Sequence, residues 1–377
     1  MHGVKRLFAW MIPRFDAARY RVSLVSLRKR DLSEEPLEAL GVDTTYLAKG
    51  RYDPTTLWAL LRLIDEKQID VLHLHGYGAT TFGRAAAALR RLPVVLHEHA
   101  NLTSTPWFQR VADRVLEPFT DVALAVSQST ARFVTDARLV REERVKVVYL
   151  GAPVGEFGQV RSDADVRATR ARLGARADDF VIGTVTRLHD SKGNEFLVDA
   201  ARRVVDRRPQ AKFFLFGEGP LQPALEAQAA RLGLGDRFVF GGFVRDVAEV
   251  LNAFDMSVFP SLWEGTPLTA FEALAAGRPI VATDADGLTD ILRDGVDAVI
   301  VPKRNSDALA DAIVALIDDP SRRAAVGAGA RATARHYDID AFVHKMERLY
   351  DILVKTSRAS RRDVVHAADL AFLTAKG

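Results

Sequence analysis

The sequence predicts an α/β protein made of two doubly wound domains, each a parallel β-sheet covered by helices. Short segments rich in Val, Ile and Leu alternate with longer amphipathic segments along the chain, which is the pattern of successive βαβ units. The pattern occurs as two series, and a stretch rich in Gly, Asp and Arg at 151–179 separates them. The length of 377 residues also exceeds a single domain of about 150 residues.

The first series contains candidate strands with helical segments between them. One helix is expected to begin at Asp53-Pro54, because Asp caps the free amides of a first turn and Pro fits the first helical position. Leu57, Leu61 and Ile64 then share one helical face. The strands are expected at Arg21–Leu27, Thr44–Leu47, Val71–His75, Val94–His97, Val122–Val126 and Val145–Leu150.

The second series repeats the alternation and predicts the second sheet. A last helical pattern follows it, with apolar residues at helical spacing from Phe342 to Leu353. We therefore expect a first domain over 1–160, a second over 161–340, and a C-terminal helix and tail over 341–377. The second-series strands are expected at Phe180–Thr184, Lys212–Phe216, Arg237–Phe240, Met256–Phe259, Ile280–Thr283 and Ala298–Val301.

Composition excludes several classes of protein. The 52 Lys and Arg against 49 Asp and Glu leave a net charge of +3, too balanced to argue for nucleic-acid binding. The absence of cysteine excludes disulfides, thiolate metal sites and a Cys nucleophile. No apolar run reaches the roughly 20 residues that span a bilayer. We expect a cytoplasmic protein.

The N-terminal segment Val4–Ile12 is both basic and apolar. We expect it to pack as the first helix of its domain. The alternative is peripheral contact with an anionic membrane surface at the inner face of the membrane, which would bring the protein to lipid-linked acceptors.

Two cations follow the first strand of the second series. Arg187 and Lys192-Gly193 lie between that strand and the next helix, and ligands of parallel sheets bind outside the carboxyl ends of the strands. Cations beside a helix N-terminus favour a dianion such as a diphosphate. The alternative is a solvated basic loop.

Two carboxylates follow the strand that ends at Phe259. Glu264 lies in the loop, Thr266 can cap a helix beginning at Pro267, and Glu272 lies about a turn and a half into that helix. A carboxylate beside the free amides of Leu268 and its neighbour would bind sugar hydroxyls, with phosphate oxygens on the amides. The alternative is that Glu264 only favours the start of the helix.

Other motifs point to no metal and no dinucleotide. Gly217-Glu218-Gly219-Pro220 resembles the opening of a dinucleotide fingerprint, but it lacks the third glycine and is interpreted as a tight turn. The Asp163/Asp165 and Asp284/Asp286 pairs are weak candidates for a divalent cation. His73 and His97 are interpreted as structural rather than as zinc ligands, and His75 and His99, at strand ends, as facing a cleft.

Taken together, these loops resemble the retaining GT-B glycosyltransferases of family four, often called glycosyl transferases group 1. The resemblance extends over nearly the whole chain, and its most specific part is the E-x7-E block. The motifs that carry it are Arg187…Lys192-Gly193, Gly217-Glu218-Gly219-Pro220, Gly242-Phe243-Val244, and Glu264-Gly265 through Phe271-Glu272-Ala273-Leu274-Ala275-Ala276-Gly277-Arg278-Pro279-Ile280-Val281-Ala282.

The resemblance implies a GT-B fold, with two Rossmann-like domains facing a cleft. It implies retaining transfer of a sugar from a UDP-, GDP- or ADP-sugar to a carbohydrate or lipid-linked acceptor hydroxyl, in polysaccharide or glycolipid synthesis, without a metal or other cofactor and without nucleic acid. If the family's roles apply to the matching residues, Arg187 and Lys192 would bind the diphosphate, Glu264 would bind the donor sugar and Glu272 would bind the ribose. His99 would lie near the reacting face of the sugar. The remaining donor-binding positions would be Gly217, Gly219, Gly242, Gly265, Thr266, Pro267 and Leu268.

Two departures from the family pattern are visible. Members usually open with a strand and a Gly-rich loop, whereas Met1-His2-Gly3 leads straight into Val4–Trp10, as if the first strand were missing. The alternative function is therefore a nucleotide-sugar-binding protein with weak or no catalysis, because its N-terminal domain is incomplete. The family's glycine pair followed by Glu also appears here as Asp286-Gly287-Leu288-Thr289-Asp290.

Overall fold

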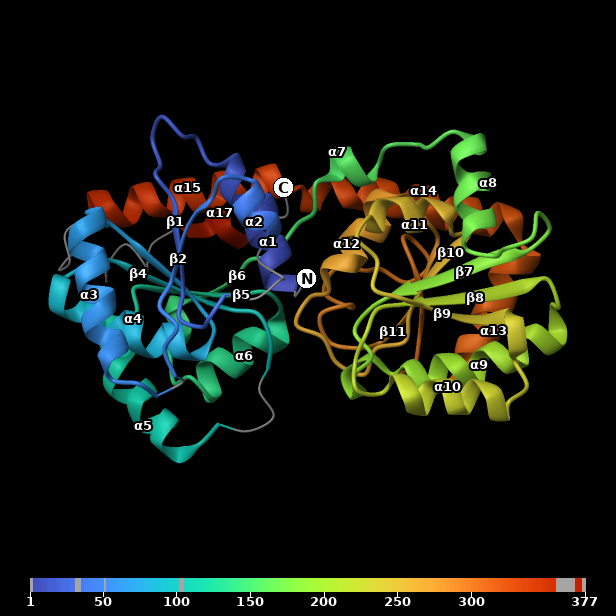
Figure 1. Ribbon diagram of the computed structural model, residues 1–377, viewed down its shortest axis with the longest axis horizontal. Helices are drawn as coiled ribbons and strands as arrows, with labels where there is room; N and C mark the ends of the chain where they lie inside the picture. Colours follow the sequence, from blue (N-terminus) through green and yellow to red (C-terminus); the bar gives the residue numbers. More distant parts are fainter. Residues whose placement is uncertain (1–2, 31–34, 51, 102–104, 357–369, 375–377) are drawn as a thin grey trace. The chain divides into compact units, whose positions relative to one another are not determined.

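The computed structural model describes residues 3–30, 35–50, 52–101, 105–356 and 370–374. It divides the chain into two compact units (Figure 1). Unit 1 is Met1–Leu150 together with Ile339–Gly377, and unit 2 is Gly151–Asp338. The division thus falls at 150/151 and 338/339, beside the expected boundaries at 160 and 340, and the C-terminal segment packs with the first unit.

Unit 2 is built on a six-stranded parallel sheet in the order β12-β11-β10-β7-β8-β9. Every strand expected in the second series is present, within one or two residues at its ends. The order reverses between β7 and β10, which pair side by side; this is the topological switch point of a doubly wound fold. The strands are β7 (Phe180–Val185), β8 (Ala211–Phe216), β9 (Phe238–Gly242), β10 (Met256–Phe259), β11 (Ile280–Thr283) and β12 (Val299–Val301).

Helices cover both faces of this sheet, so its strands are apolar on both sides (Figure 1). Leu197 and Val204 of α9 pack with Ile313 and Leu316 of α13 in one large buried cluster. Helices α12 and α14 pack against each other on the other face. The helices are α9 (Asn194–Arg207), α10 (Gln222–Arg231), α11 (Val247–Ala253), α12 (Leu268–Ala275), α13 (Ser306–Asp318) and α14 (Pro320–Ala334).

The expectation that residues 151–179 form an irregular linker is wrong. This segment contains helices α7 (Val154–Phe157) and α8 (Asp163–Arg172). Ser162 caps α8 by accepting a hydrogen bond from the Asp165 amide at 3.1 Å. Polar contacts rather than an apolar face attach α8, since Arg170 pairs with Asp255 at 2.7 Å. A helix without apolar periodicity leaves no signal for pattern analysis.

Unit 1 contains two separate parallel sheets. The six strands expected in the first series are present, but β1 and β2 pair with each other while β3, β4, β5 and β6 form the second sheet in that order. The strands are β1 (Ser23–Ser26), β2 (Asp43–Tyr46), β3 (Leu72–His75), β4 (Val94–Glu98), β5 (Val122–Ala125) and β6 (Val145–Val147). The helices are α1 (Gly3–Met11), α2 (Glu35–Ala39), α3 (Thr55–Lys67), α4 (Tyr77–Arg90), α5 (Trp107–Leu116), α6 (Gln128–Asp136), α15 (Ile339–Lys355) and α17 (Ala371–Thr374).

The N-terminal helix α1 packs within unit 1. Leu7 and Met11 are buried, and the Phe8 ring contacts the His75 ring edge-on with centroids 4.7 Å apart. Helix α1 lies against α2 and α15. Of the two interpretations of Val4–Ile12, the structure therefore shows the packed helix.

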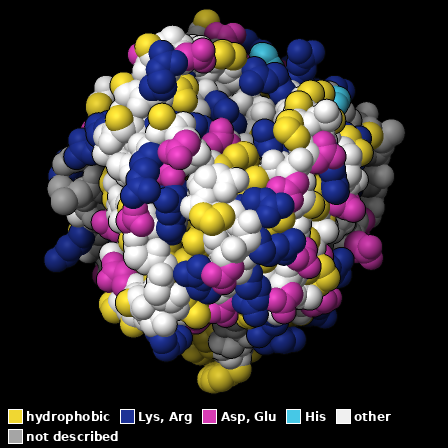
Figure 2. Space-filling view, turned by 90° about the vertical axis from the view of Figure 1, so that its right-hand side faces the viewer, with side chains coloured by type: hydrophobic (Ala, Val, Ile, Leu, Met, Phe, Trp, Pro, Cys, Tyr) yellow, Lys and Arg dark blue, Asp and Glu magenta, His cyan; other side chains and the backbone are white. Residues whose placement is uncertain are grey.

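The surface carries both signs of charge. On the face seen in Figure 2, basic and acidic side chains are interspersed, in keeping with the small net charge. Among the helices that the structure describes, none is long and apolar enough to cross a bilayer.

Candidate donor site

The candidate site lies at the switch point of unit 2. Strands β7 and β10 pair with Ile182 beside Met256, so the loops that follow them leave the same edge of the sheet together. These are the loop at 186–193 and the loop at 260–267, which carry the cations and carboxylate singled out from the sequence. The carboxyl ends of neighbouring strands at a switch point are where doubly wound proteins bind their ligands.

Lys192 and Glu264 form an ion pair between these two loops. The Lys192 Nζ lies 2.5 and 2.6 Å from the two carboxylate oxygens of Glu264. The Ser261 hydroxyl donates to the same carboxylate at 2.7 Å. Both charged side chains are mostly shielded from water, with 12% of Lys192 and 8% of Glu264 exposed. Sequence analysis assigned no role to Ser261. Its position two residues after the end of β10 is the one feature of the sequence that indicates it.

The backbone holds the two loops in this arrangement. The Leu262 amide donates to the Ser191 carbonyl at 2.8 Å. Gly193 has a φ of +57°, and a Cβ at this position would lie 2.1 Å from the Pro260 carbonyl oxygen. A side chain at 193 would therefore push the loops apart and separate Lys192 from Glu264.

The first turn of helix α12 directly follows the 260–267 loop that carries Glu264. It begins at Leu268 with Pro267 as N-cap residue, so the expectation that Thr266 caps a helix beginning at Pro267 is wrong. The Thr266 hydroxyl instead donates to the Gly265 carbonyl at 2.8 Å. Within the part of the chain that the structure describes, the N–H groups of Leu268 and Thr269, in the first turn of the helix, make no backbone hydrogen bond, so they can donate to an anion. Glu272 lies within α12 and is fully buried.

Gly217 and Gly219 pack directly against the backbone of the loop that carries Arg187. A Cβ on Gly217 would lie 1.7 Å from the Thr186 carbonyl oxygen, and one on Gly219 would lie 2.2 Å from that of Leu188. The loops are joined by a hydrogen bond from the Leu188 amide to the Glu218 carbonyl at 3.0 Å. The Gly217 amide also donates to Gly242 at 2.7 Å. These glycines are thus required for the close approach of backbones beside the site.

Arg187 stands apart from the ion pair. Its side chain is exposed, and within the described part of the chain it makes no hydrogen bond or ion pair. Its carbonyl accepts a long hydrogen bond of 3.4 Å from the buried side-chain amide of Asn194. The structure therefore brings together Lys192, Glu264, Gly265 and the first turn of α12, whereas Arg187, on the same 186–193 loop as Lys192, is exposed.

The carboxylate pairs considered for metals have other roles. Asp284 accepts a hydrogen bond from the Lys303 amide at 2.8 Å, and Asp165 bonds Ser162 at the start of α8. Among the described residues, one group places its ligand atoms within 4.8 Å of one another, and it consists of His73, His75 and His97 in unit 1.

His99 belongs to unit 1, where it completes an array of four imidazoles. His73 and His75 of β3 stack with centroids 4.3 Å apart, as do His97 of β4 and His99 just after it. Hydrogen bonds cross between the strands, at 3.1 Å from His73 to His97 and 2.8 Å from His75 to His99. All four imidazoles lie together because alternate residues of two paired strands share one face, and the interpretation that His75 and His99 face a cleft stays a prediction. Tyr350 of α15 adds a hydrogen bond of 2.5 Å to His73.

The four imidazoles of this array are uncharged at neutral pH, because the pKa of each is lowered. Burial, reinforced by repulsion from the neighbouring imidazoles, lowers the pKa of His73 to about 3, and burial lowers the pKa of His99 to about 4. The pKa values of His75 and His97 lie well below the usual value for the same reasons. Burial disfavours the charged imidazolium form, and repulsion between neighbouring rings adds to this effect.

Stability of unit 1 should therefore decrease in mild acid. An unfolded histidine takes up a proton near pH 6.5, whereas the pKa is about 3 for His73, about 4 for His99 and well below the usual value for His75 and His97, so the unfolded state binds more protons in mild acid. Urea unfolding should show the free energy falling from pH 6.5 towards pH 4.5, by up to about 1.4 kcal/mol per pH unit for each histidine. His97→Gln should flatten this dependence. His344→Asn, which removes an exposed histidine of α15, is the matched control; an equal effect of both variants would contradict the assignment.

Comparison with known proteins identifies the family. Residues 179–319 match the family model of glycosyl transferases group 1, and residues 1–155 match that of glycosyltransferase family 4. A D-inositol 3-phosphate glycosyltransferase of Thermobispora bispora is 31% identical over 306 residues, which are 74% of this chain and 70% of the relative. The alpha-D-kanosaminyltransferase of Streptomyces kanamyceticus is 28% identical over 67% of this chain and 68% of its own length.

Solved structures show the same fold. A glycosyltransferase from Rickettsia africae has a TM-score of 0.84 at 14% identity, covering 94% of this chain and 96% of that one. Anabaena HepE, solved with UDP and glucose, has a TM-score of 0.81 at 24% identity over the same shares. This is the GT-B fold expected from the loop motifs. With the ion pair of Lys192 and Glu264 at its switch point and both halves matching the family models, the chain belongs to the group 1 glycosyltransferases of family 4.

Proposed function

We propose that this glycosyltransferase moves a sugar from a nucleoside diphosphate sugar to an acceptor hydroxyl with retention of the anomeric configuration. The observation that supports this best is the Lys192–Glu264 pair, shielded from water at the switch point of unit 2. It places a cation for a diphosphate and a carboxylate for sugar hydroxyls within one hydrogen bond of each other.

Lys192 and the first-turn amides of α12 stabilise the departing diphosphate in this proposal. When the bond between the anomeric carbon and the β-phosphate oxygen breaks, negative charge develops on that oxygen. A preorganised ammonium and unpaired N–H groups stabilise that charge without reorganising. Lys192 then turns from Glu264 to the phosphate, and Glu264 accepts a hydrogen bond from the donor sugar. Arg187, on the same loop as Lys192, adds a second cation for the diphosphate.

Retention follows from attack on the same face. The acceptor oxygen forms its bond to the anomeric carbon as the phosphate leaves, and the acceptor proton passes to the departing phosphate oxygen. The Glu264 carboxylate already accepts hydrogen bonds from Lys192 and Ser261, which makes it a poor covalent nucleophile.

Relatives support synthesis of a polysaccharide or glycolipid. They include a galactosyltransferase from Escherichia coli that acts on a sugar-diphosphoundecaprenol, 24% identical over 71% of both chains. They also include a phosphatidyl-myo-inositol mannosyltransferase of Mycobacterium leprae, 28% identical over 81% of this chain. A carbohydrate or lipid-linked acceptor fits both. The UDP in Anabaena HepE makes a UDP-sugar the first donor to test.

A donor screen followed by product analysis tests the proposal. A bound donor stabilises the native state by about 2.7 kcal/mol at a concentration 100 times its Kd, so UDP-, GDP- and ADP-sugars can be ranked by the shift in Tm. With the stabilising donor, proton NMR should show a product of the same anomeric configuration as the donor. A product of opposite configuration would overturn the retaining mechanism, and no stabilisation by any nucleotide sugar would overturn the donor class.

A further inference from the structure

Helix α5 of unit 1 has its polar face inside and its apolar face outside. Gln109 and Asp113 are buried, whereas Trp107, Val111 and Val115 are 76%, 54% and 64% exposed. These three recur every four residues and so form one stripe along the helix. A surface helix in a globular domain normally has the opposite orientation.

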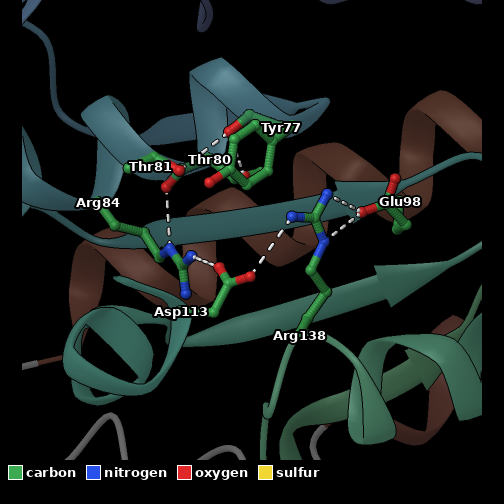
Figure 3. A network of polar contacts seen from close by, with 7 residues as sticks. All are labelled: Tyr77, Thr80, Thr81, Arg84, Glu98, Asp113 and Arg138. Atoms are coloured by element: carbon green, nitrogen blue, oxygen red, sulfur yellow. Dashed lines mark hydrogen bonds and ion pairs between the residues drawn. The ribbon is translucent and has the colours of Figure 1, made fainter. Parts of the chain in front are cut away.

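The inward face is held by a buried network of charges (Figure 3). The Asp113 carboxylate pairs with Arg84 of α4 and, at 3.5 Å, with Arg138. Arg138 also donates two hydrogen bonds of 2.8 and 2.9 Å to Glu98 at the end of β4. Turning α5 to bury its apolar stripe would leave both guanidinium groups buried without Asp113, which costs several kcal/mol. The exposure of the stripe is therefore built into the fold.

The outward face combines apolar and positively charged side chains. Phe108 is also exposed, and its ring contacts the exposed Tyr52 ring with centroids 5.7 Å apart. Arg110 and Arg114 are exposed beside the stripe, and the outward-facing side chains of α5 include no carboxylate. We refer to Trp107, Phe108, Val111, Val115, Arg110 and Arg114 as the α5 face.

We propose that the α5 face docks unit 1 onto the surface of an anionic lipid bilayer. A tryptophan and apolar residues on one side, with arginines beside them, is the pattern of helices that lie in the bilayer interface. Tryptophan is favoured at the level of the headgroups, and each basic residue near the surface is attracted by anionic lipids. A protein partner of matching shape would need an acidic, apolar surface, whereas an anionic bilayer supplies both properties without complementary shape.

This surface lies on α5, whereas the sequence directed attention to Val4–Ile12, which packs inside the unit. The proposal does not depend on the donor or acceptor chemistry, because binding to lipid is measured without either. A failure here would leave the proposed glycosyl transfer intact, and a failure of the transfer would leave this proposal intact.

Sedimentation with vesicles tests the proposal. The full chain should bind vesicles of phosphatidylcholine with 30% phosphatidylglycerol, and bind pure phosphatidylcholine vesicles far less. Arg110→Gln/Arg114→Gln should weaken binding about 30-fold, because each basic residue at the surface contributes a factor of about 5. Trp107→Ser/Val111→Ser should weaken it at least about tenfold. Val160→Ser/Val296→Ser, which removes two exposed valines of unit 2, is the matched control and should bind like the wild type.

Tryptophan quenching locates the contact. Brominated lipids should quench tryptophan fluorescence in the wild type, and Trp107→Phe should remove most of that quenching although Trp10, Trp58 and Trp263 remain. Quenching that persists in Trp107→Phe would overturn the assignment to α5. The proposal would also be overturned by equal binding of the α5-face variants and the control, or by self-association of the wild type that Trp107→Ser/Val111→Ser abolishes.

Discussion

Lys192→Ala should lower kcat/KM for glycosyl transfer by about 10²- to 10³-fold, the usual effect of removing one preorganised group that stabilises developing negative charge. Its Nζ is the cation held by Glu264 at the switch point, 2.5 and 2.6 Å from that carboxylate. The loss should appear mainly in kcat, because the interaction with the leaving phosphate strengthens as the bond breaks. Lys355→Ala, which removes an exposed lysine of α15, is the matched control.

The same substitution leaves the Glu264 carboxylate shielded from water without its cation, so part of any loss could come from destabilised loops. The double variant Lys192→Ala/Glu264→Gln removes both charges and should recover stability without recovering activity. Steady-state kinetics and thermal unfolding of the two variants separate these effects. Activity of Lys192→Ala equal to that of the control, with the protein folded, would remove Lys192 from the site.

Asp113→Asn should destabilise unit 1 by about 3 to 5 kcal/mol, the cost of breaking a buried ion pair by removing one partner. Asp113 and Arg84 are both inaccessible to solvent, so the remaining guanidinium has no water to replace the carboxylate. Arg138 keeps its hydrogen bonds to Glu98, so Arg84 bears most of the loss.

Urea unfolding followed by tryptophan fluorescence, in which the partly buried Trp10 reports on unit 1, measures this effect. Glu66→Gln is the matched control, since the Arg62–Glu66 pair is exposed and such pairs contribute about 0 to 1 kcal/mol. A change below 1 kcal/mol for Asp113→Asn would show that the network does not hold α5 in place, and would weaken the argument for its outward apolar face.

Strands were the most predictable part of the fold. The central strands β4, β5, β8, β10 and β11 are mostly apolar segments that are buried along their whole length, so composition marks them, whereas β1, β2 and β6 are more polar and only partly buried. The pairing of these strands was not predictable in unit 1, where β1 and β2 form a sheet of their own. Helix α8 was missed because capping and ion pairs, rather than an apolar stripe, hold it.

The donor loops were found because chemistry-bearing residues that follow parallel strands share one edge of the sheet. The sequence could not show that Lys192 bonds Glu264 while Arg187, on the same loop, stays exposed. That distinction depends on the side-chain directions set by Gly193 against Pro260, a contact between loops about 70 residues apart.

The sequence by itself determined the alternation of strands and helices and the loops that carry donor-binding residues, because these follow from local periodicity and from short motifs. The tertiary structure alone decided which charges meet, that four histidines stack as one neutral array, and that α5 turns its apolar stripe outward. These features depend on residues far apart in the chain whose burial is settled by packing, and burial is what makes an ion pair strong, a histidine neutral or an exposed tryptophan available for binding.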